Sequence, residues 1–344
     1  MENKKLKIAF LNIYQGMVGR GAETFIDELS TRLARNHDVK VIAGNHSAYP
    51  RWPLLWRFYL DPSGIMILLF TLRMVPKLIW QKYDIVVPTN GGWQTLIVRL
   101  LTWLTGKKMV ISGQSGIGWF DRNNLWLFPD LFVATSTRAL VWANKVNPFV
   151  NCVYIPNGVD LTKFNIDVIP RNINLPKPII LCVGALTKSK NIDLVIQAVA
   201  KVKNASLLVV GDGYMREEIN FLGRNLLNHR FNLLTLPHSD MPQVYKAADV
   251  FVLTSSEREA FGIVYVEAMA SNLPIVARDD DQRREIVGDA GVLVKDPHDI
   301  NQLSLAIIKA LDAHWDNKPK KQAQKFDWDK IAQQYEILFE EIRK

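Results

Sequence analysis

The segment that decides the fold is DVFVLTSSEREAFGIVYVEAMASNLPIVA, residues 249–277. It begins with a short β-rich run, passes through a polar turn, continues as a helix-forming run and ends in a second β-rich run. Strands and helices that alternate in this way form βαβ units, in which the two strands lie parallel in one sheet. The segment therefore predicts an α/β fold.

The same alternation runs through the whole chain, in two halves. The predicted strands are residues 6–13, 38–44, 83–89, 107–113, 129–135 and 151–157 in the first half and 178–184, 205–213, 231–236, 249–255, 273–279 and 290–294 in the second. The predicted helices include 22–35, 64–80, 92–104, 137–145, 192–203, 215–227 and 328–343. Residues 168–178 contain three prolines and no apolar period, which predicts a linker.

These patterns predict a Rossmann-like N-terminal domain of residues 1–168, a Rossmann-like domain of residues 169–325, and a last helix, 326–344, that packs back on the first domain. A length of 344 residues suits two domains of ordinary size. Open parallel sheets bind ligands at the carboxyl ends of their strands, so two facing sheets predict a cleft between them.

Composition excludes several classes of protein. With 48% hydrophobic and 22% charged residues, the chain is neither disordered nor fibrous. Cys152 and Cys182 are too few for a disulfide framework or a zinc cluster, and both lie in apolar runs, which favours buried thiols and a reducing, cytoplasmic compartment. We expect no secretory signal, because no cleavage site follows the first apolar run. The most apolar stretch, 65–72, is too short to span a membrane and ends at Arg73.

The positive charge lies entirely in the first half. Residues 1–167 contain 19 Lys and Arg against 11 Asp and Glu, whereas the remainder has 23 of each. Eight of the ten tryptophans are also in the first half, in segments such as YPRWPLLWRFYLDPSG. Interleaved aromatic and basic residues indicate docking to an anionic membrane surface or a lipid-linked acceptor, although solubility charge and core tryptophans are an alternative. No nucleic-acid-binding motif is present, so we expect no nucleic-acid partner.

Glycines follow several predicted strands. Gly19 and Gly21 lie in GMVGRGAET before a helix, where small residues let backbone amides approach a phosphate; a plain tight turn is the alternative. Gly184 follows another strand, with Lys190 just before the next helix, which is explained if an anion binds between them. Gly211 ends the following strand at the same edge.

Two glutamates flank the most informative turn. Glu259 follows the strand at 249–255, and Glu267 lies just over one turn into the helix that Gly262 begins. Backbone amides at Phe261, Gly262 and Ile263 would suit a diphosphate, whereas carboxylates suit pairs of hydroxyl groups. A ligand with a diphosphate between hydroxylated rings is a nucleotide sugar. Helix capping is the alternative role for the glutamates.

The chain resembles the retaining glycosyltransferases of family 4, which have the GT-B architecture. The most specific element is the E-x7-E motif, Glu259-AFGIVYV-Glu267. Supporting elements are GRGAET, IPNGVD at 155–160, VGALTKSKN, VVGDG, REIVGDAGVLV and FDWDKIAQQY, so the resemblance covers nearly the whole chain.

The resemblance implies a role for each residue. Glu267 would hold the ribose hydroxyls and Glu259 the hydroxyls of the donor sugar. The amides of 261–263 and of the Gly19–Gly21 loop would bind the diphosphate, and Lys190 would neutralise the departing phosphate. No metal or other cofactor is expected, because helix ends and cationic side chains replace it.

Two positions depart from the family pattern. Ala185 stands where an arginine usually partners the lysine, so Lys188 or an arginine elsewhere compensates, or catalysis is weakened. No histidine lies in ISGQSGIGWFDR, so Gln114 or Ser115 takes its hydrogen-bonding role. The histidines, among them His37, His46 and His238, are interpreted as surface or turn residues.

The implied reaction is transfer of a sugar from an NDP-sugar to an acceptor hydroxyl with retention of configuration, in glycolipid or polysaccharide synthesis at a membrane surface. The alternatives are a sugar-nucleotide epimerase and a GT-B subunit that binds a nucleotide sugar without turnover. Neither the sugar, the base nor the acceptor follows from the pattern, because a few pocket contacts decide them.

Overall fold

The computed structural model describes residues 5–16, 21–44, 52, 54–257 and 259–343. These residues form two compact units, residues 1–157 with 328–344 and residues 158–327, so the chain changes unit before the predicted boundary at 168. Gly19, one of the predicted phosphate-binding glycines, lies outside the described residues.

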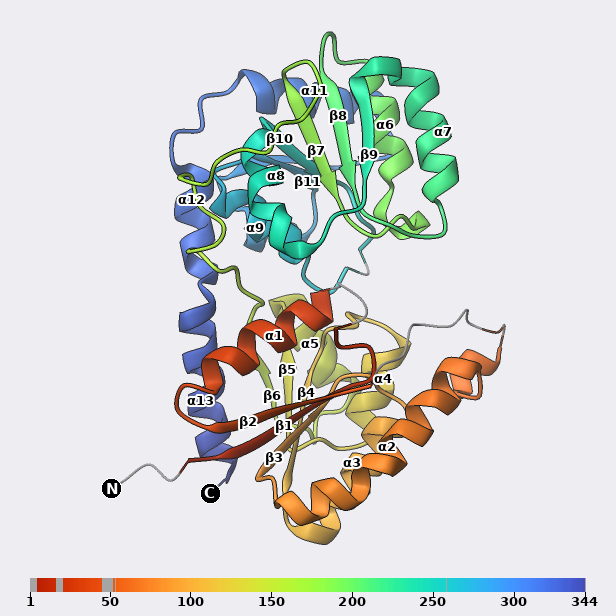
Figure 1. The fold of residues 1–344 in the computed structure, drawn as a ribbon, viewed down its shortest axis with the longest axis vertical. Coiled ribbons are helices and arrows are strands. Elements are labelled where there is room, and N and C mark those ends of the chain that lie inside the picture. The colour runs from red at the N-terminus through yellow and green to blue at the C-terminus, as the bar shows by residue number, and fades with distance from the viewer. Residues whose placement is uncertain (1–4, 17–20, 45–51, 53, 258, 344) are drawn as a thin grey trace. The chain divides into compact units, whose positions relative to one another are not determined.

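The first unit is built on a parallel sheet of six strands in the order β2-β1-β3-β4-β5-β6 (Figure 1). The strands are β1 (Lys7–Asn12), β2 (Asp38–Ala43), β3 (Ile85–Pro88), β4 (Lys108–Ser112), β5 (Leu131–Ala134) and β6 (Cys152–Tyr154). β1, β3 and β5 are almost wholly buried, as expected of parallel strands that are covered on both faces.

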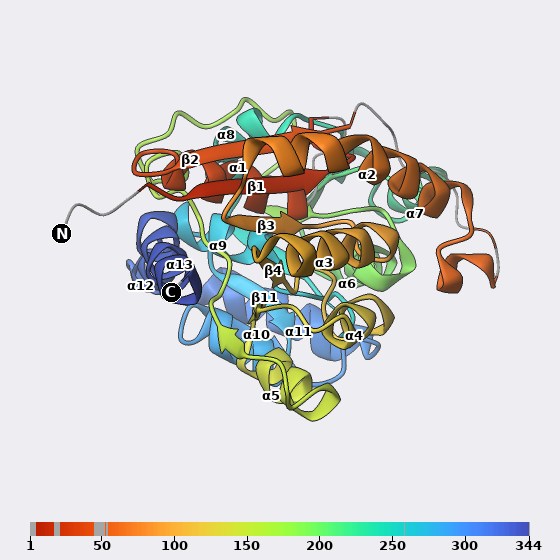
Figure 2. The ribbon, with the colours of Figure 1, turned by 90° about the horizontal axis from the view of Figure 1, so that it is seen from below.

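Helices cover both faces of this sheet. They are α1 (Gly21–Leu33), α2 (Pro62–Gln81), α3 (Trp93–Thr105), α4 (Trp119–Trp126), α5 (Thr137–Val146) and α13 (Trp328–Arg343). α1 and α13 contribute to one apolar cluster, and α2 to α5 contribute to another. α2 and α3 lie side by side (Figures 1 and 2). The sequence patterns did not predict α4, which has only a weak apolar face.

The chain returns to the first unit as α13. Phe25 of α1 packs against the rings of Trp328 and Tyr335, with centroids 6.1 and 5.8 Å away. Arg32 Nε donates to Asp329 Oδ1 at 2.8 Å, and the hydroxyls of Ser112 and Tyr335 are 3.2 Å apart. α13 is thus part of the hydrophobic core of this unit, although it is last in the chain.

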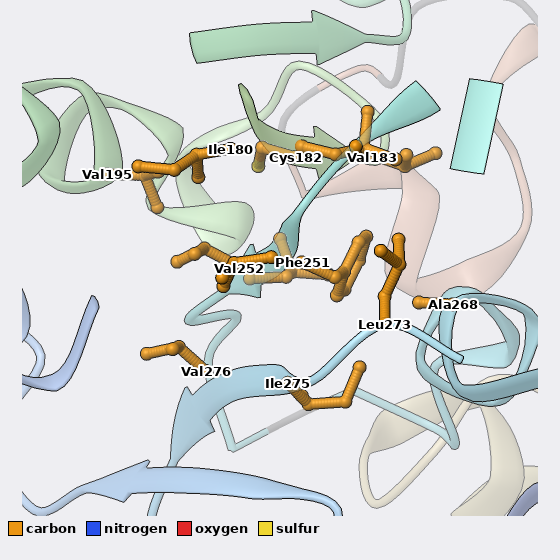
Figure 3. Close-up of a cluster of buried hydrophobic side chains, with 14 of the residues drawn as sticks. Ile180, Cys182, Val183, Val195, Phe251, Val252, Ala268, Leu273, Ile275 and Val276 are labelled. Carbon is orange, nitrogen blue, oxygen red and sulfur yellow. The ribbon is translucent and has the colours of Figure 1, made fainter. Parts of the chain in front are cut away.

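The second unit has its own parallel sheet, in the order β12-β11-β10-β7-β8-β9. Its strands are β7 (Ile179–Val183), β8 (Ser206–Val210), β9 (Phe231–Leu234), β10 (Val250–Leu253), β11 (Ile275–Arg278) and β12 (Gly291–Val294). Its helices are α6 (Ile192–Ala200), α7 (Arg216–Leu227), α8 (Met241–Ala247), α9 (Ile263–Ala270), α10 (Asp281–Val287), α11 (Ile300–Asp312) and α12 (Lys318–Ala323). Figure 3 shows Cys182, Phe251 and Ile275 of the central strands packed in one buried cluster.

All twelve predicted strands are present, and the prediction of an α/β fold with parallel sheets is confirmed. Both cysteines are free thiols. Burial raises the pKa of Cys182 to about 12 and that of half-buried Cys152 to about 11, so both stay protonated near neutral pH.

The expectation about the apolar stretch at 65–72 is corrected. A helical segment, Leu55–Gln81, runs for 27 residues and is, by length and composition, long and apolar enough to cross a membrane. Of its most apolar stretch of 18 residues, 28% is buried. Arg73 does not end it, because a long basic side chain can lie along an apolar helix with its charge in solvent. Asp61 begins α2 by accepting a hydrogen bond from Gly64 N at 3.0 Å.

The packing of α13 predicts a matched pair of stabilities. Phe339→Ala removes a fully buried ring and should lower the free energy of unfolding of the first unit by about 3–5 kcal/mol. Ile337→Ala, on the same helix but half exposed, should change it by about 0.5 kcal/mol or less. Urea denaturation of both variants measures the difference; equal losses would show that α13 is not part of this core.

Candidate functional site

The strand order of the second unit reverses between β7 and β10. After β7 the chain passes through α6 and forms β8, which pairs with one edge of β7. It later returns and forms β10, which pairs with the other edge of β7. The loops that leave the two strands therefore diverge, and ligands of open α/β sheets bind at such a point, outside the carboxyl ends of the strands. Lys190 lies in the loop after β7 and Glu259 in the loop after β10.

Hydrogen bonds hold these loops against one another. Ser256 N donates to Ser189 O at 2.7 Å, and Asn191 Nδ2 donates to Thr254 O at 2.8 Å. Leu186 N donates to Asp212 O at 2.9 Å, which attaches the loop after β8. The three loops thus form one continuous layer along the carboxyl edge of the sheet.

Two of the predicted glycines have a packing role in this layer. A Cβ at Gly211 would lie 1.9 Å from the carbonyl oxygen of Gly184, so only glycine permits the two loops to approach. A Cβ at Gly184 would lie 3.7 Å from Lys190 Cδ, because the lysine side chain lies over this glycine. Gly211 is therefore required for the close approach of the two loops, whereas a side chain at Gly184 would make only an ordinary van der Waals contact with Lys190.

Lys190 and Glu259 form an ion pair that is largely shielded from solvent. Burial by itself would raise the pKa of the Glu259 carboxyl, but Lys190, its hydrogen bonds and the charge of Arg283 together hold that pKa below its ordinary value. Glu259 is therefore ionised at neutral pH. It can accept hydrogen bonds from hydroxyl groups, and the lysine beside it offers donors to an anion.

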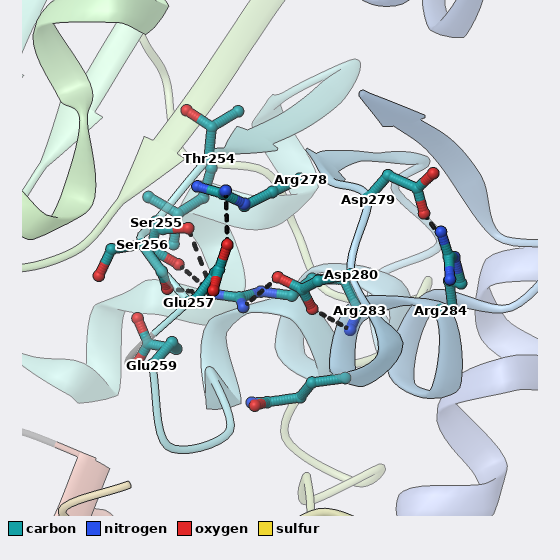
Figure 4. Close-up of polar contacts among 12 residues, drawn as sticks. Thr254, Ser255, Ser256, Glu257, Glu259, Arg278, Asp279, Asp280, Arg283 and Arg284 are labelled. Carbon is teal, nitrogen blue, oxygen red and sulfur yellow. Dashed lines mark hydrogen bonds and ion pairs between the residues drawn. The ribbon is translucent and has the colours of Figure 1, made fainter. Parts of the chain in front are cut away.

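Arg283 is a cation that the sequence analysis did not identify. It is fully buried at α10 and donates to Ser255 Oγ at 2.8 Å and to Ser256 O at 2.9 Å (Figure 4). Asp280 accepts from its other terminal nitrogen at 2.6 Å. Through these hydrogen bonds Arg283 holds in place the loop that leads to Glu259.

Two cations are candidates to replace the arginine that is missing at Ala185. Arg283 is too deeply buried to meet a ligand directly. Lys188 is exposed, and its backbone amide donates to the Tyr214 hydroxyl at 3.1 Å.

The helix that carries Glu267 begins in a conformation that needs glycine. Gly262 has a φ of +85°, and a Cβ there would lie 2.6 Å from the Tyr265 ring. Ile263 is the first residue of α9, so its amide is among those that have no partner within the helix. The Phe261 side chain is buried against Phe326, with ring centroids 5.8 Å apart. The chain therefore enters α9 with its first amides directed along the helix axis.

Glu267 is buried and already has two partners. The Tyr245 hydroxyl donates to Oε2 at 2.8 Å, and His238 Nε2 lies 2.7 Å from Oε1. His238 was interpreted only as a surface or turn residue; it is half exposed in a short 3-10 helix, but its ring contacts Glu267. Each carboxylate oxygen has a further lone pair, so the group can still accept from a ligand hydroxyl.

The remaining predicted residues belong to the first unit. Gly21 is the exposed first residue of α1. Gln114 follows β4 and exchanges two hydrogen bonds with Asn157, at 2.9 and 2.8 Å, while its Nε2 also donates to Ser112 Oγ at 2.9 Å. These bonds tie the ends of β4 and β6 together and occupy the amide that was expected to meet a sugar.

One group of described side chains could hold a metal by distance alone, namely His37, Glu336 and Glu340. His37 Nδ1 accepts from Leu6 N at 3.3 Å, so the proton of the neutral ring is on Nε2, which faces Glu336 at 3.2 Å. Nε2 then has no lone pair for a cation. We interpret the group as a structural contact between α13 and the end of α1.

One hollow of the second unit is lined by none of the predicted residues. It has a volume of about 550 Å³ and is lined by Asp249, Asn272 and Pro274, which precede or lie between strands at the amino edge of the sheet. None of its lining residues is a predicted donor-binding residue. The candidate site is therefore identified by strand topology and side-chain chemistry.

Residues 165–326 match the family model described as glycosyl transferases group 1. This segment includes every predicted site residue of the second unit. The GDP-mannose-dependent monoacylated alpha-(1-6)-phosphatidylinositol monomannoside mannosyltransferase of Corynebacterium glutamicum is 29% identical over 178 residues, and this match spans 46% of each chain. The chain thus covers about half the length of that relative.

Solved structures match over nearly the full length. Sucrose-phosphate synthase from Thermosynechococcus elongatus has a TM-score of 0.78 at 20% identity, covering 98% of this chain and 99% of that one. Anabaena HepE in complex with UDP-glucose has a TM-score of 0.73 at 20% identity, covering 97% and 99%. The predicted GT-B class, with two Rossmann-like sheets, is confirmed.

Buried Asp121 predicts a pH-dependent stability in the first unit. Burial raises its pKa to about 7, although Asn124 and the amides of Ser115 and Gly116 donate to it. The folded chain therefore holds a proton that the unfolded chain releases from about pH 4 upward, so this group lowers stability as pH rises to about 7. Asp121→Asn should gain stability over the natural chain, on the order of 3 kcal/mol between about pH 4 and 8.

Urea denaturation at several pH values measures this gain. Asp289→Asn, at an exposed position, is the matched control and should change the free energy of unfolding by about 0.5 kcal/mol or less. A constant difference between Asp121→Asn and the natural chain across this range would contradict the assignment.

Proposed function

We propose that the chain transfers a sugar from an NDP-sugar to an acceptor hydroxyl and retains the anomeric configuration, which the match of residues 165–326 to the glycosyl transferases group 1 model supports. The observation that carries the proposal is the arrangement around the start of α9. An ionised glutamate paired with a lysine stands before the helix, and a buried glutamate lies within its second turn.

The two glutamates suit the two ends of such a donor. Glu267, held by Tyr245 and His238, would accept the ribose hydroxyls with its remaining lone pairs. Glu259 would accept hydroxyls of the sugar. Both carboxylates are oriented before the donor binds, which reduces the entropy that binding costs.

The diphosphate would bind between these glutamates. The amides at Phe261, Gly262 and Ile263 and the dipole of α9 favour an anion there. Lys190 would move from Glu259 toward the phosphate or share its donors between both groups. We propose that these positive groups perform the neutralisation for which other transferases use a metal ion.

The proposed step breaks the bond between the anomeric carbon and the phosphate oxygen. The acceptor oxygen forms its bond to the same face of that carbon, and its proton passes to the departing phosphate oxygen. Charge stabilisation and positioning are then the main contributions of the protein. A trapped covalent glycosyl-enzyme would contradict this route.

We propose that the first unit serves the acceptor and that the acceptor is a lipid-linked or polysaccharide glycan at a membrane surface. The excess of positive charge in residues 1–167 supports an anionic partner. The C. glutamicum relative is named as a mannosyltransferase that acts on a phosphatidylinositol monomannoside, which is consistent with this proposal. A cytoplasmic location, peripheral on the inner face of the membrane, follows from it.

A thermal-shift screen against UDP-, GDP-, ADP- and dTDP-sugars tests the donor class. A ligand at one hundred times its Kd should stabilise the protein by about 2.7 kcal/mol. We expect one nucleotide to shift the second unit, and its free diphosphate to shift it as well. If no nucleotide diphosphate produces a shift, the proposal fails.

Three variants separate the roles of the charged residues. Glu267→Gln should weaken nucleotide binding by about 1–3 kcal/mol, because a buried partner of the ribose is lost. Lys190→Gln should lower turnover by about 10²- to 10³-fold, with a smaller effect on binding. Glu257→Gln is the matched control, since Glu257 lies in the same loop but is exposed and pairs with Arg278.

Donor hydrolysis and nucleotide titration provide the two measurements. Slow release of free sugar and nucleotide diphosphate supports a transferase. Conversion of the donor into its epimer would identify an epimerase, and binding with no turnover would identify a subunit without activity.

A further inference from the structure

One face of the first unit is apolar although it is exposed. On α2 the side chains of Ile65, Leu69, Leu72, Ile79 and Trp80 are exposed and recur at helical spacing, so they form one stripe. Trp80 is 85% exposed and Leu69 is 54% exposed. Soluble proteins rarely expose a continuous apolar patch of this kind without a partner.

The neighbouring helix also exposes apolar side chains. Leu100, Trp103 and Leu104 of α3 are exposed as well, and α3 lies beside α2 (Figures 1 and 2). We name the exposed side chains of these two helices the α2–α3 face. It contains two exposed tryptophans, a residue type that is enriched where apolar and aqueous phases meet.

The charged side chains that α2 and α3 themselves carry all have one sign, whereas Asp84 and Asp130 beside these helices pair with Lys107 and Arg99. Neither α2 nor α3 contains an aspartate or glutamate. Arg73 is exposed on α2, and Lys82 follows the helix at its exposed end. This distribution complements an anionic surface.

A small apolar hollow opens at the end of the face. It has a volume of about 290 Å³ and is lined by Leu78, Ile79 and Leu101 together with Lys82 and Lys107. An apolar hollow with lysines at its edge suits part of a lipid chain below an anionic headgroup.

The inner side of α2 shows that the helix belongs to the folded unit. Ile67, Phe70 and Leu78 are buried in the core. Trp93 Nε1 of α3 donates to Tyr59 O, just before α2, at 2.9 Å. Inserting α2 across a bilayer would break these contacts and open the core.

We propose that the α2–α3 face is a docking surface for an anionic phospholipid bilayer and that α2 lies along the bilayer rather than crosses it. This docking would bring the proposed transferase to its membrane-bound acceptor. Its biological purpose rests on the proposed function, but the docking itself does not. A second copy of the chain is a poorer occupant, because it would bring the Arg73 and Lys82 side chains of two chains together with no acidic side chain on either helix.

Co-sedimentation with vesicles tests the proposal on the full chain. Vesicles of phosphatidylcholine with 30% phosphatidylglycerol should bind at least about tenfold more protein at low salt than vesicles of phosphatidylcholine alone. High salt should reduce the difference, because exposed charges are screened. Equal binding to both vesicles would overturn the proposal.

Matched variants locate the contact. Trp80→Ser with Trp103→Ser should reduce vesicle binding at least about fivefold, whereas Phe221→Ser with Leu305→Ser, at exposed apolar positions of the second unit, should not. Arg73→Gln with Lys82→Gln should reduce the preference for phosphatidylglycerol, and Lys203→Gln with Lys309→Gln, which removes the same charge from the second unit, should leave it unchanged. Equal effects of test and control variants would contradict docking by this face.

Two further outcomes would overturn the proposal in specific ways. Bound protein that resists alkaline carbonate extraction would show that α2 spans the bilayer. A dimer in lipid-free solution that Trp80→Ser with Trp103→Ser converts to a monomer would show that a second copy covers the face.

Nucleotide titration and donor hydrolysis in solution separate this proposal from the proposed function. The face variants should keep the natural nucleotide affinity, because every donor-binding residue proposed for the second unit is unchanged. Face variants that lose vesicle binding but keep donor hydrolysis would support docking by the α2–α3 face. A natural chain that binds vesicles but neither binds nor hydrolyses a donor would contradict the transferase function and leave the docking proposal standing.

Discussion

Parallel strands all end at the same edge of a sheet, and the candidate site depends on this constraint. The order of the second sheet reverses between β7 and β10, so the loops that leave these strands turn away from each other. One main-chain hydrogen bond, from Ser256 N to Ser189 O, and one from the Asn191 side chain to Thr254 O join the two loops. Lys190 and Glu259, 69 residues apart in the chain, meet because their strands are neighbours.

Burial determines how strongly the charges of Lys190 and Glu259 interact. A lysine and a glutamate on an open surface would gain little from pairing, but in a shielded loop Lys190 helps to hold the pKa of the Glu259 carboxyl below its ordinary value, so the carboxyl stays ionised. Arg283 adds a third charge that no ligand reaches, and its hydrogen bonds to the Ser255–Ser256 loop are made only inside the protein. The candidate site is therefore a surface of polar groups supported by a buried cation.

The first unit shows that apolar residues need not all serve one core. α2 is apolar around most of its circumference, yet its inner side alone suffices to pack the sheet. The side chains of its outer side stay between 45% and 85% exposed. A helix that is apolar on every side is expected inside a large core or in contact with lipid. Only the inner side of α2 lies in a core.

The sequence by itself determined the twelve strands, the α/β class and the motif residues Glu259 and Glu267, because strand patterns and turn residues are local properties. It could not show which side chains meet across long separations. His238 and Tyr245 contact Glu267, Gln114 is engaged by Asn157, and Arg283 lies under the loop. Each of these contacts follows from the order of strands in a sheet and from burial. Strand order and burial are properties of the whole folded chain, so no local stretch of sequence specifies them.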